Sequence, residues 1–258
     1  MNIKDLKRRF FLLLLAIAVS TFTIKAKQIT DTIAVDSLTV DSLVINDLTV
    51  DNLSAYELEV VDSIKPIQNI LFIGDSMTGW LSERFAAYGV ENGFKVSTVV
   101  WDGSTISKWA KSRKLPEIIK KYSPDAVFIC LGLNELFERN PDRNLSRHLQ
   151  SILQSIGEIP YLWIGPPSWP GKGKGDILNE WLQSNLDDNS FYYSGNLELP
   201  RQSRTNPHPT RSGVIEWADK IIEWLSQSNN YFPNIKKPEK AQMVRGEKFI
   251  YKRMNETL

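Results

Sequence analysis

The stretch Asn69-Ile70-Leu71-Phe72-Ile73-Gly74-Asp75-Ser76 decides the fold and locates the first functional residue. Its consecutive apolar residues are typical of a strand that is buried on both faces, and the glycine after them marks the end of that strand. Ser76 then stands where the strand breaks into a loop, on a rigid support with its hydroxyl exposed. A serine in such a place can act as a nucleophile when a histidine accepts its proton. The chain has only two histidines, and His208 is the one that we expect to pair with Ser76.

Apolar runs and amphipathic stretches alternate from residue 65 onward. Five runs predict strands, at Ile70–Ile73, Lys95–Val99, Ala126–Leu131, Tyr161–Ile164 and Phe191–Tyr193. Helical stretches lie between and after them, at Leu81–Tyr88, Pro116–Tyr122, Leu145–Ile156, Ile177–Leu186 and Ser212–Leu225. Strands that alternate with helices predict an α/β fold, in which helices cover both faces of a parallel sheet.

Several candidate site residues follow the predicted strands directly. Ser76, Gly103, Asn134 and the Gly165-Pro166-Pro167 loop each come after a strand end. Ligands of parallel sheets bind beyond the carboxyl ends of the strands, so these positions are expected to meet. Taken singly, Ser76 and Asn134 could cap helices and Gly103 could make a turn. Their joint placement favours a functional site.

Four blocks resemble the SGNH/GDSL hydrolase family in order and spacing, over roughly residues 68–226. They are Gly74-Asp75-Ser76, Trp101-Asp102-Gly103-Ser104, Gly132-Leu133-Asn134-Glu135 and His208-Pro209-Thr210. The resemblance implies a flavodoxin-like three-layer sandwich with a five-stranded parallel sheet. It implies an ester hydrolase with Ser76 as nucleophile and His208 as general base and then acid. The sequence shows neither a metal-binding cluster nor a dinucleotide-type glycine-rich loop, so no cofactor or metal is expected. The oxyanion donors would be the backbone N–H groups of Ser76 and Gly103 and the side-chain amide of Asn134.

One position departs from the family pattern. Family members carry an aspartate three residues before the histidine, and Thr205 stands there in this chain. No carboxylate lies between Glu198 and His208. The sequence leaves three alternatives open: a backbone carbonyl or Asn206 orients the imidazole, a distant carboxylate substitutes, or activity is weakened or lost.

The first 26 residues have the pattern of an export signal. A basic segment with Lys4, Lys7, Arg8 and Arg9 precedes the apolar run Phe10–Val19, and Ile24-Lys25-Ala26 is an acceptable cleavage site. We therefore expect a periplasmic, cell-surface or secreted protein, attached to a membrane only if this segment is not cleaved. Cys130 is the sole cysteine, so an intrachain disulfide is excluded, and its apolar surroundings predict an inert core thiol.

Residues 27–63 form an acidic segment with a five-residue repeat. An aliphatic residue recurs at 33, 38, 43, 48, 53 and 58, and residues 28–63 hold eight carboxylates and no lysine or arginine. This period fits neither a helix nor a flat strand, and it is weakly similar to pentapeptide repeats, which predicts a short β-solenoid. An acidic extended linker is the alternative. As a solenoid of six units, the segment would pack either on the following domain or on copies of itself, and the second case would mediate self-association.

Residues 64–230 are predicted as the hydrolase domain and 231–258 as a basic C-terminal extension. Seven basic and three acidic residues in 231–258 account for the whole net charge of +4 over 64–258. The domain itself is therefore neutral, which gives no argument for nucleic-acid binding.

The expected substrate is an acylated carbohydrate or another small ester. Trp80 and Trp101 flank the first two blocks, and an exposed indole would suit the apolar face of a sugar ring, although both could equally be core residues. The loop 165–175 adds Trp169 and lysines that would suit an anionic polymer. The leading prediction is an exported serine esterase that removes acetyl or another short acyl group from a carbohydrate. An O-acyltransferase with the same residues, and a non-catalytic glycan-binding envelope protein with a degenerate site, are the alternatives.

Overall fold

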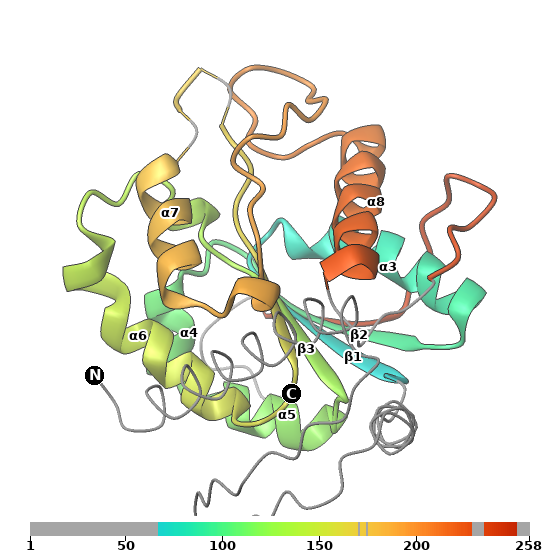
Figure 1. Ribbon diagram of the computed structural model, residues 1–258, viewed down its shortest axis with the longest axis horizontal. Coiled ribbons are helices and arrows are strands. Elements are labelled where there is room, and N and C mark those ends of the chain that lie inside the picture. Colours follow the sequence, from blue (N-terminus) through green and yellow to red (C-terminus); the bar gives the residue numbers. More distant parts are fainter. Residues whose placement is uncertain (1–66, 170, 174, 229–234, 252–258) are drawn as a thin grey trace, which may run out of the picture. The chain divides into compact units, whose positions relative to one another are not determined.

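The protein contains a six-stranded parallel sheet with helices on both faces (Figure 1). The computed structural model describes residues 67–251 except 170, 174 and 229–234, so the predicted export signal and repeat lie outside the described residues. The strand order is β5-β4-β3-β1-β2-β6. The strands are β1 (Asn69–Gly74), β2 (Lys95–Trp101), β3 (Ala126–Cys130), β4 (Tyr161–Ile164), β5 (Phe191–Tyr192) and β6 (Glu247–Tyr251).

The central strands are buried on both faces because their alternate side chains enter two separate cores. From β1, Ile70 and Phe72 enter one core, and Leu71 and Ile73 enter the other. Helices α3 (Thr78–Asn92) and α8 (Arg211–Ser228) cover the first face. The second face is covered by α4 (Ile106–Ser112), α5 (Leu115–Tyr122), α6 (Pro141–Ile156) and α7 (Asp176–Asn185), and the two groups lie on opposite sides of the sheet in Figure 1. The α/β sandwich predicted from the sequence is therefore confirmed.

Two elements differ from the prediction. Helix α4 was not expected, because seven residues are too few to display helical periodicity; the Thr105 side chain caps it by accepting a hydrogen bond from the Lys108 N–H at 3.1 Å. The sheet also has six strands rather than five. The added strand, β6, comes from the segment predicted as a C-terminal extension, and it pairs in parallel with β2 at the sheet edge.

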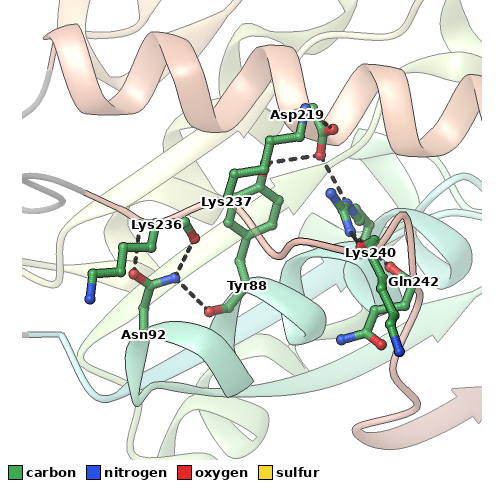
Figure 2. Close-up of polar contacts among 8 residues, drawn as sticks. Tyr88, Asn92, Asp219, Lys236, Lys237, Lys240 and Gln242 are labelled. Atoms are coloured by element: carbon green, nitrogen blue, oxygen red, sulfur yellow. Dashed lines mark hydrogen bonds and ion pairs between the residues drawn. The ribbon is translucent and has the colours of Figure 1, made fainter.

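Polar contacts from α3 and α8 hold the segment before β6, and Figure 2 shows them. Arg84 of α3 is fully buried, and its guanidinium donates to Asp219 Oδ1 at 2.9 Å and to the carbonyls of Lys240 and Gln242. Asn92, also on α3, binds the backbone of Lys236 through both atoms of its amide. These contacts fix the path of the chain toward β6. Among the described helices, none is both long and apolar enough to cross a membrane.

Candidate active site

Ser76 lies two residues beyond the end of β1, in a turn that packs tightly against the end of β3. The Asp75 N–H donates to the Cys130 carbonyl at 3.1 Å, which draws the turn against the end of β3. A Cβ atom on Gly74 would lie 2.0 Å from that same carbonyl oxygen, so only glycine fits there. The Asp75 carboxylate then accepts the Met77 N–H at 2.9 Å. The sequence Gly-Asp-Ser thereby fixes the direction in which Ser76 points.

His208 reaches Ser76 from the loop before α8. Its Nε2 atom lies 2.9 Å from Ser76 Oγ, although the two residues are 132 positions apart in the chain. Its other ring nitrogen, Nδ1, lies 3.1 Å from Asn206 Oδ1. The same Oδ1 accepts the backbone N–H of His208 at 3.0 Å. Ser76, His208 and Asn206 thus form one continuous hydrogen-bonded chain.

These contacts determine which nitrogen of His208 carries the proton. Asn206 must present its oxygen to the His208 backbone N–H, because an amide NH₂ cannot accept a hydrogen bond. The same oxygen can bind Nδ1 only if Nδ1 is protonated. In the neutral ring, Nε2 is then the acceptor, and the Ser76 hydroxyl donates to it. This is the tautomer that a general base for Ser76 requires.

Asn206 therefore occupies the orienting position that the sequence left open. Neither ring nitrogen of His208 is hydrogen-bonded to a carboxylate among the residues that the structure describes. The Thr205 hydroxyl instead lies 3.1 Å from Ser203 Oγ, so it does not face the imidazole. Asn206 was named as one of several alternatives, since the sequence shows its proximity to His208 but not the turn that brings its oxygen to the ring.

Arg201 holds the loop that carries these two residues, and the sequence gave no reason to single it out. Its Nε donates to the Pro207 carbonyl at 3.0 Å and its Nη1 to the Leu199 carbonyl at 2.9 Å. Its Nη2 donates to the Ser168 carbonyl in the neighbouring loop. In addition, the Trp169 indole N–H donates to the Thr205 carbonyl at 3.3 Å. The predicted Gly165-Pro166-Pro167 loop thus leads into contacts that position the histidine loop.

Gly103 and Asn134 follow the carboxyl ends of β2 and β3, the two neighbours of β1 in the sheet. Gly103 has φ of +65°, a conformation that favours glycine, and no atom lies within 4 Å of where its Cβ would be. The Asn134 side-chain amide donates to the Ser104 carbonyl at 2.8 Å, which ties the two loops together. One amide hydrogen of Asn134 remains available. The structure therefore brings Ser76, Gly103 and Asn134 to adjacent strand ends.

Burial is the main cause of the pKa shifts of Asp75, Glu135 and His208 at the site. Burial raises the pKa of Asp75 to about 7, and one of its oxygens, Oδ2, has no hydrogen-bond partner within the described part of the chain. Burial also raises the pKa of Glu135, even though this carboxylate accepts the Ile106 N–H at 2.7 Å. Burial lowers the pKa of His208 below its usual 6.5, with Asp102 opposing the shift and Arg201 adding to it. His208 therefore stays neutral, and able to accept a proton, down to a lower pH than an exposed histidine does.

The two tryptophans beside the motif blocks have different environments. Trp101 is buried at 7% exposure, where it packs edge-on against Trp109, so the core interpretation holds for it. Trp80 is 48% exposed and lines a cleft next to Ser76. The second histidine, His148, lies on α6 and takes no part in the hydrogen bonds around Ser76. Cys130 is buried and unpaired at the end of β3, as predicted.

No family model matches the chain, and no curated protein matches it. Among solved structures, 17 chains match. A gut microbial diltiazem-metabolizing enzyme has 13% identity and a TM-score of 0.45, with 62% of this chain and 47% of that chain covered. A Clostridium thermocellum family 3 carbohydrate esterase has 14% identity and a TM-score of 0.49, with 63% and 96% covered.

A two-domain esterase active on acetylated mannans has 15% identity and a TM-score of 0.47, with 72% of this chain and 56% of that chain covered. The matching region thus spans about half the length of this esterase and of the diltiazem-metabolizing enzyme. At these identities and TM-scores the likeness carries no inference about activity. Function has to be argued from the site.

Proposed function

We propose that the protein is a serine esterase of the SGNH type, which hydrolyses acetyl or another short acyl ester of a carbohydrate. The observation that carries the proposal is the hydrogen-bonded chain from Ser76 Oγ through the His208 imidazole to Asn206 Oδ1, with distances of 2.9 and 3.1 Å. A serine whose hydroxyl donates to an oriented, neutral imidazole is an activated nucleophile. The resemblance of the four motif blocks to the SGNH/GDSL family supports the same reading.

In the first half of the reaction, Ser76 Oγ attacks the ester carbonyl carbon while its proton passes to His208 Nε2. The carbonyl oxygen becomes an oxyanion, which the resemblance assigns to the Ser76 and Gly103 N–H groups and the Asn134 amide. Loss of one such donor costs about 2.7–4 kcal/mol of transition-state stabilisation in a serine protease. The imidazolium then donates its proton to the leaving alcohol, and an acyl ester of Ser76 remains.

In the second half, water attacks the acyl-Ser76 carbonyl and gives a proton to His208. Collapse of the second tetrahedral intermediate breaks the bond to Ser76 Oγ, which takes the proton back from His208. The products are the carboxylic acid and the free enzyme. Asn206 holds Nδ1–H in place throughout both halves, so that Nε2 always faces the reacting oxygen.

Two features of the cleft beside Ser76 support a carbohydrate as the alcohol part of the ester. The cleft has a volume of about 290 Å³, which suits a single sugar ring. The half-exposed indole of Trp80 lines this cleft and would suit the apolar face of a sugar ring. The proposed place of action is the periplasm or cell surface, which rests on the sequence pattern of residues 1–26.

The test is hydrolysis of p-nitrophenyl esters of increasing acyl length by the protein and four variants. Ser76→Ala and His208→Ala should each lower kcat by about 10⁴-fold or more, as removal of such residues does in serine proteases. Ser184→Ala on the exposed side of α7 and His148→Ala on α6 serve as matched controls and should retain activity. Activity that persists in Ser76→Ala would contradict the proposal. A preference for long acyl chains would contradict the short-acyl assignment.

A further inference from the structure

The cleft beside Ser76 is lined in part by residues that have no role in the proposed chemical steps. Trp80 of α3, Val100 of β2 and Ile250 of β6 supply apolar surface, next to Ser76 and His208. Trp80 and Ile250 are 48% and 42% exposed, which makes them two of the few large apolar side chains that the described surface exposes. Val100 and Ile250 are register partners in the sheet, so the cleft is closed on one side by the C-terminal strand.

The position of the catalytic groups indicates which part of an ester this cleft receives. His208 and Asn206 line it together with Ser76, whereas Gly103 and Asn134, which supply two of the three proposed oxyanion donors, do not. In the tetrahedral intermediate, the oxyanion points toward its donors and the leaving oxygen must face His208 Nε2, which protonates it. The side of the site that His208 lines is therefore the side of the leaving alcohol.

The lining residues also carry information about the chemistry of that alcohol. Trp80 offers an indole surface, which suits a ring with an apolar face. The exposed carboxylate of Asp102 can accept hydrogen bonds from hydroxyl groups. The Lys248 ammonium in the same lining donates to the Gly79 carbonyl and to Glu83 Oε1, both at 3.3 Å, so its charge is already matched. Among the residues that the structure describes, Asp102 forms no ion pair, so the unmatched charge in the cleft is negative, and it repels an anionic ligand.

We propose that this cleft is the subsite for the leaving alcohol, and that the alcohol is a neutral sugar ring lying against Trp80 and Ile250. The inference rests on the proposed esterase function and goes beyond it by assigning the charge of the sugar and the residues that select it. The volume of about 290 Å³ suits a single ring. Lys172 does not enter this selection, because its ammonium lies 4.6 Å from the Trp169 ring centroid and outside the lining.

The experiment varies the alcohol and the acyl group separately, in the full-length protein, with acid release as the signal. At constant acyl group, the substrates are ethyl acetate, acetylated methyl glucoside and acetylated methyl glucuronide. At constant alcohol, they are ethyl acetate and ethyl butyrate. The variants are Trp80→Ala, Trp80→Phe and Asp102→Asn, with Ile177→Ala as the control, since Ile177 is 54% exposed on α7 and lies outside the cleft.

For Trp80→Ala, the ratio of kcat/KM for acetylated methyl glucoside to that for ethyl acetate should fall by about tenfold, which corresponds to about 1.4 kcal/mol. The acetate-to-butyrate ratio should not change. Trp80→Phe should keep most of the glucoside preference, because it keeps an aromatic face. Ile177→Ala should leave both ratios unchanged.

Asp102→Asn should raise the ratio of glucuronide to glucoside activity, since it removes the repelling charge. Because this measurement is a ratio at one pH, any change in the pKa of His208 cancels. A Trp80→Ala protein with an altered acetate-to-butyrate ratio and an unaltered glucoside ratio would make the cleft an acyl pocket and overturn the inference. An unaltered glucuronide ratio in Asp102→Asn would overturn the charge assignment. Failure of the proposed function is distinguishable, because the natural protein would then hydrolyse none of these esters, or Ser76→Ala would hydrolyse them as fast as the natural protein does.

Discussion

At the scale of single residues, the orienting group of His208 is the feature that sets this site apart. An amide oxygen at 3.1 Å from Nδ1 fixes the ring and its tautomer, but it brings no negative charge to stabilise the imidazolium. A carboxylate in the same place would do both. The site is therefore built to orient the base while leaving its pKa low.

The first prediction concerns Asn206. Asn206→Ala should lower kcat by roughly 10- to 10³-fold, less than the about 10⁴-fold loss seen when a triad aspartate is replaced by asparagine in a serine protease. Asn206→Asp should raise the pKa of His208, because a carboxylate beside Nδ1 favours the charged ring. Since the base must be neutral to act, the acid limb of kcat/KM should move to higher pH. In the natural protein that limb should lie below pH 6.5, because burial lowers the pKa of His208.

Thr205→Asp is the matched control for this pH shift. Thr205 occupies the sequence position of the family aspartate, but its hydroxyl contacts Ser203 rather than the imidazole. Its replacement should leave the acid limb where it is. A limb that moves with Thr205→Asp and not with Asn206→Asp would show that position 205, and not 206, governs the histidine.

Sequence patterns predicted most residues of the candidate site, but not the residues that hold them in position. Ser76, Gly103, Asn134 and His208 could be predicted because each stands in a motif block, after a strand or before a helix. Arg201 could not be predicted, because its role depends on hydrogen bonds to three backbone carbonyls from two loops. No pattern of residue types in the sequence predicts such contacts. The turn that brings Asn206 to His208 depends in part on those same contacts.

At the scale of elements, strand and helix prediction succeeded where apolar runs were long. The buried runs of β1 to β4 were recognised because helices cover both faces of these strands. Strand β6 was missed because its burial alternates, with Phe249 and Tyr251 packing inward while Lys248 and Ile250 are exposed. The run Lys248-Phe249-Ile250-Tyr251 does carry a strand signal, since three of its four residues favour strands.

The second prediction concerns the contact between β1 and β3. Gly74→Ala would place a Cβ 2.0 Å from the Cys130 carbonyl oxygen and 2.3 Å from Thr78 Oγ1, so the backbone must move. We expect the free energy of unfolding to fall by about 1–3 kcal/mol or more, as overpacking does elsewhere. Activity should fall as well, because Ser76 is two residues away. Denaturant unfolding and ester hydrolysis measure the two effects.

Gly93→Ala provides the comparison, because Gly93 ends α3 with φ of +82° and has no atom within 4 Å of its missing Cβ. The cost there is conformational alone, at about 1–2 kcal/mol. Activity should be retained, since Gly93 lies at the amino end of β2, away from Ser76. Equal losses of activity in the two variants would contradict the close-approach argument.

At the scale of the whole described domain, the C-terminal segment is part of the fold and of the candidate substrate cleft. Residues 235–251 run from the contacts with Asn92 and Arg84 to β6, and Ile250 of β6 then lines the cleft beside Ser76. Arg84 is the centre of this attachment. It is fully buried, and it joins Asp219 of α8 to two carbonyls of the segment.

The last prediction is that Arg84→Met releases the C-terminal segment. Loss of the guanidinium takes the Arg84 donor from the Gln242 carbonyl, leaves the Lys240 carbonyl with the Gln242 N–H alone, and takes one partner from Asp219. Breaking a buried pair in this way costs about 3–5 kcal/mol. Amide hydrogen exchange should therefore rise in residues 235–251 and in β2, which loses its edge partner. Lys237→Ala is the control, because Lys237 is 66% exposed and its ion pair with Asp219 is worth at most about 1 kcal/mol.

If the segment is what closes the cleft, Arg84→Met should also weaken the preference for acetylated methyl glucoside over ethyl acetate. Unchanged exchange in residues 235–251 would show that other contacts hold the segment in place.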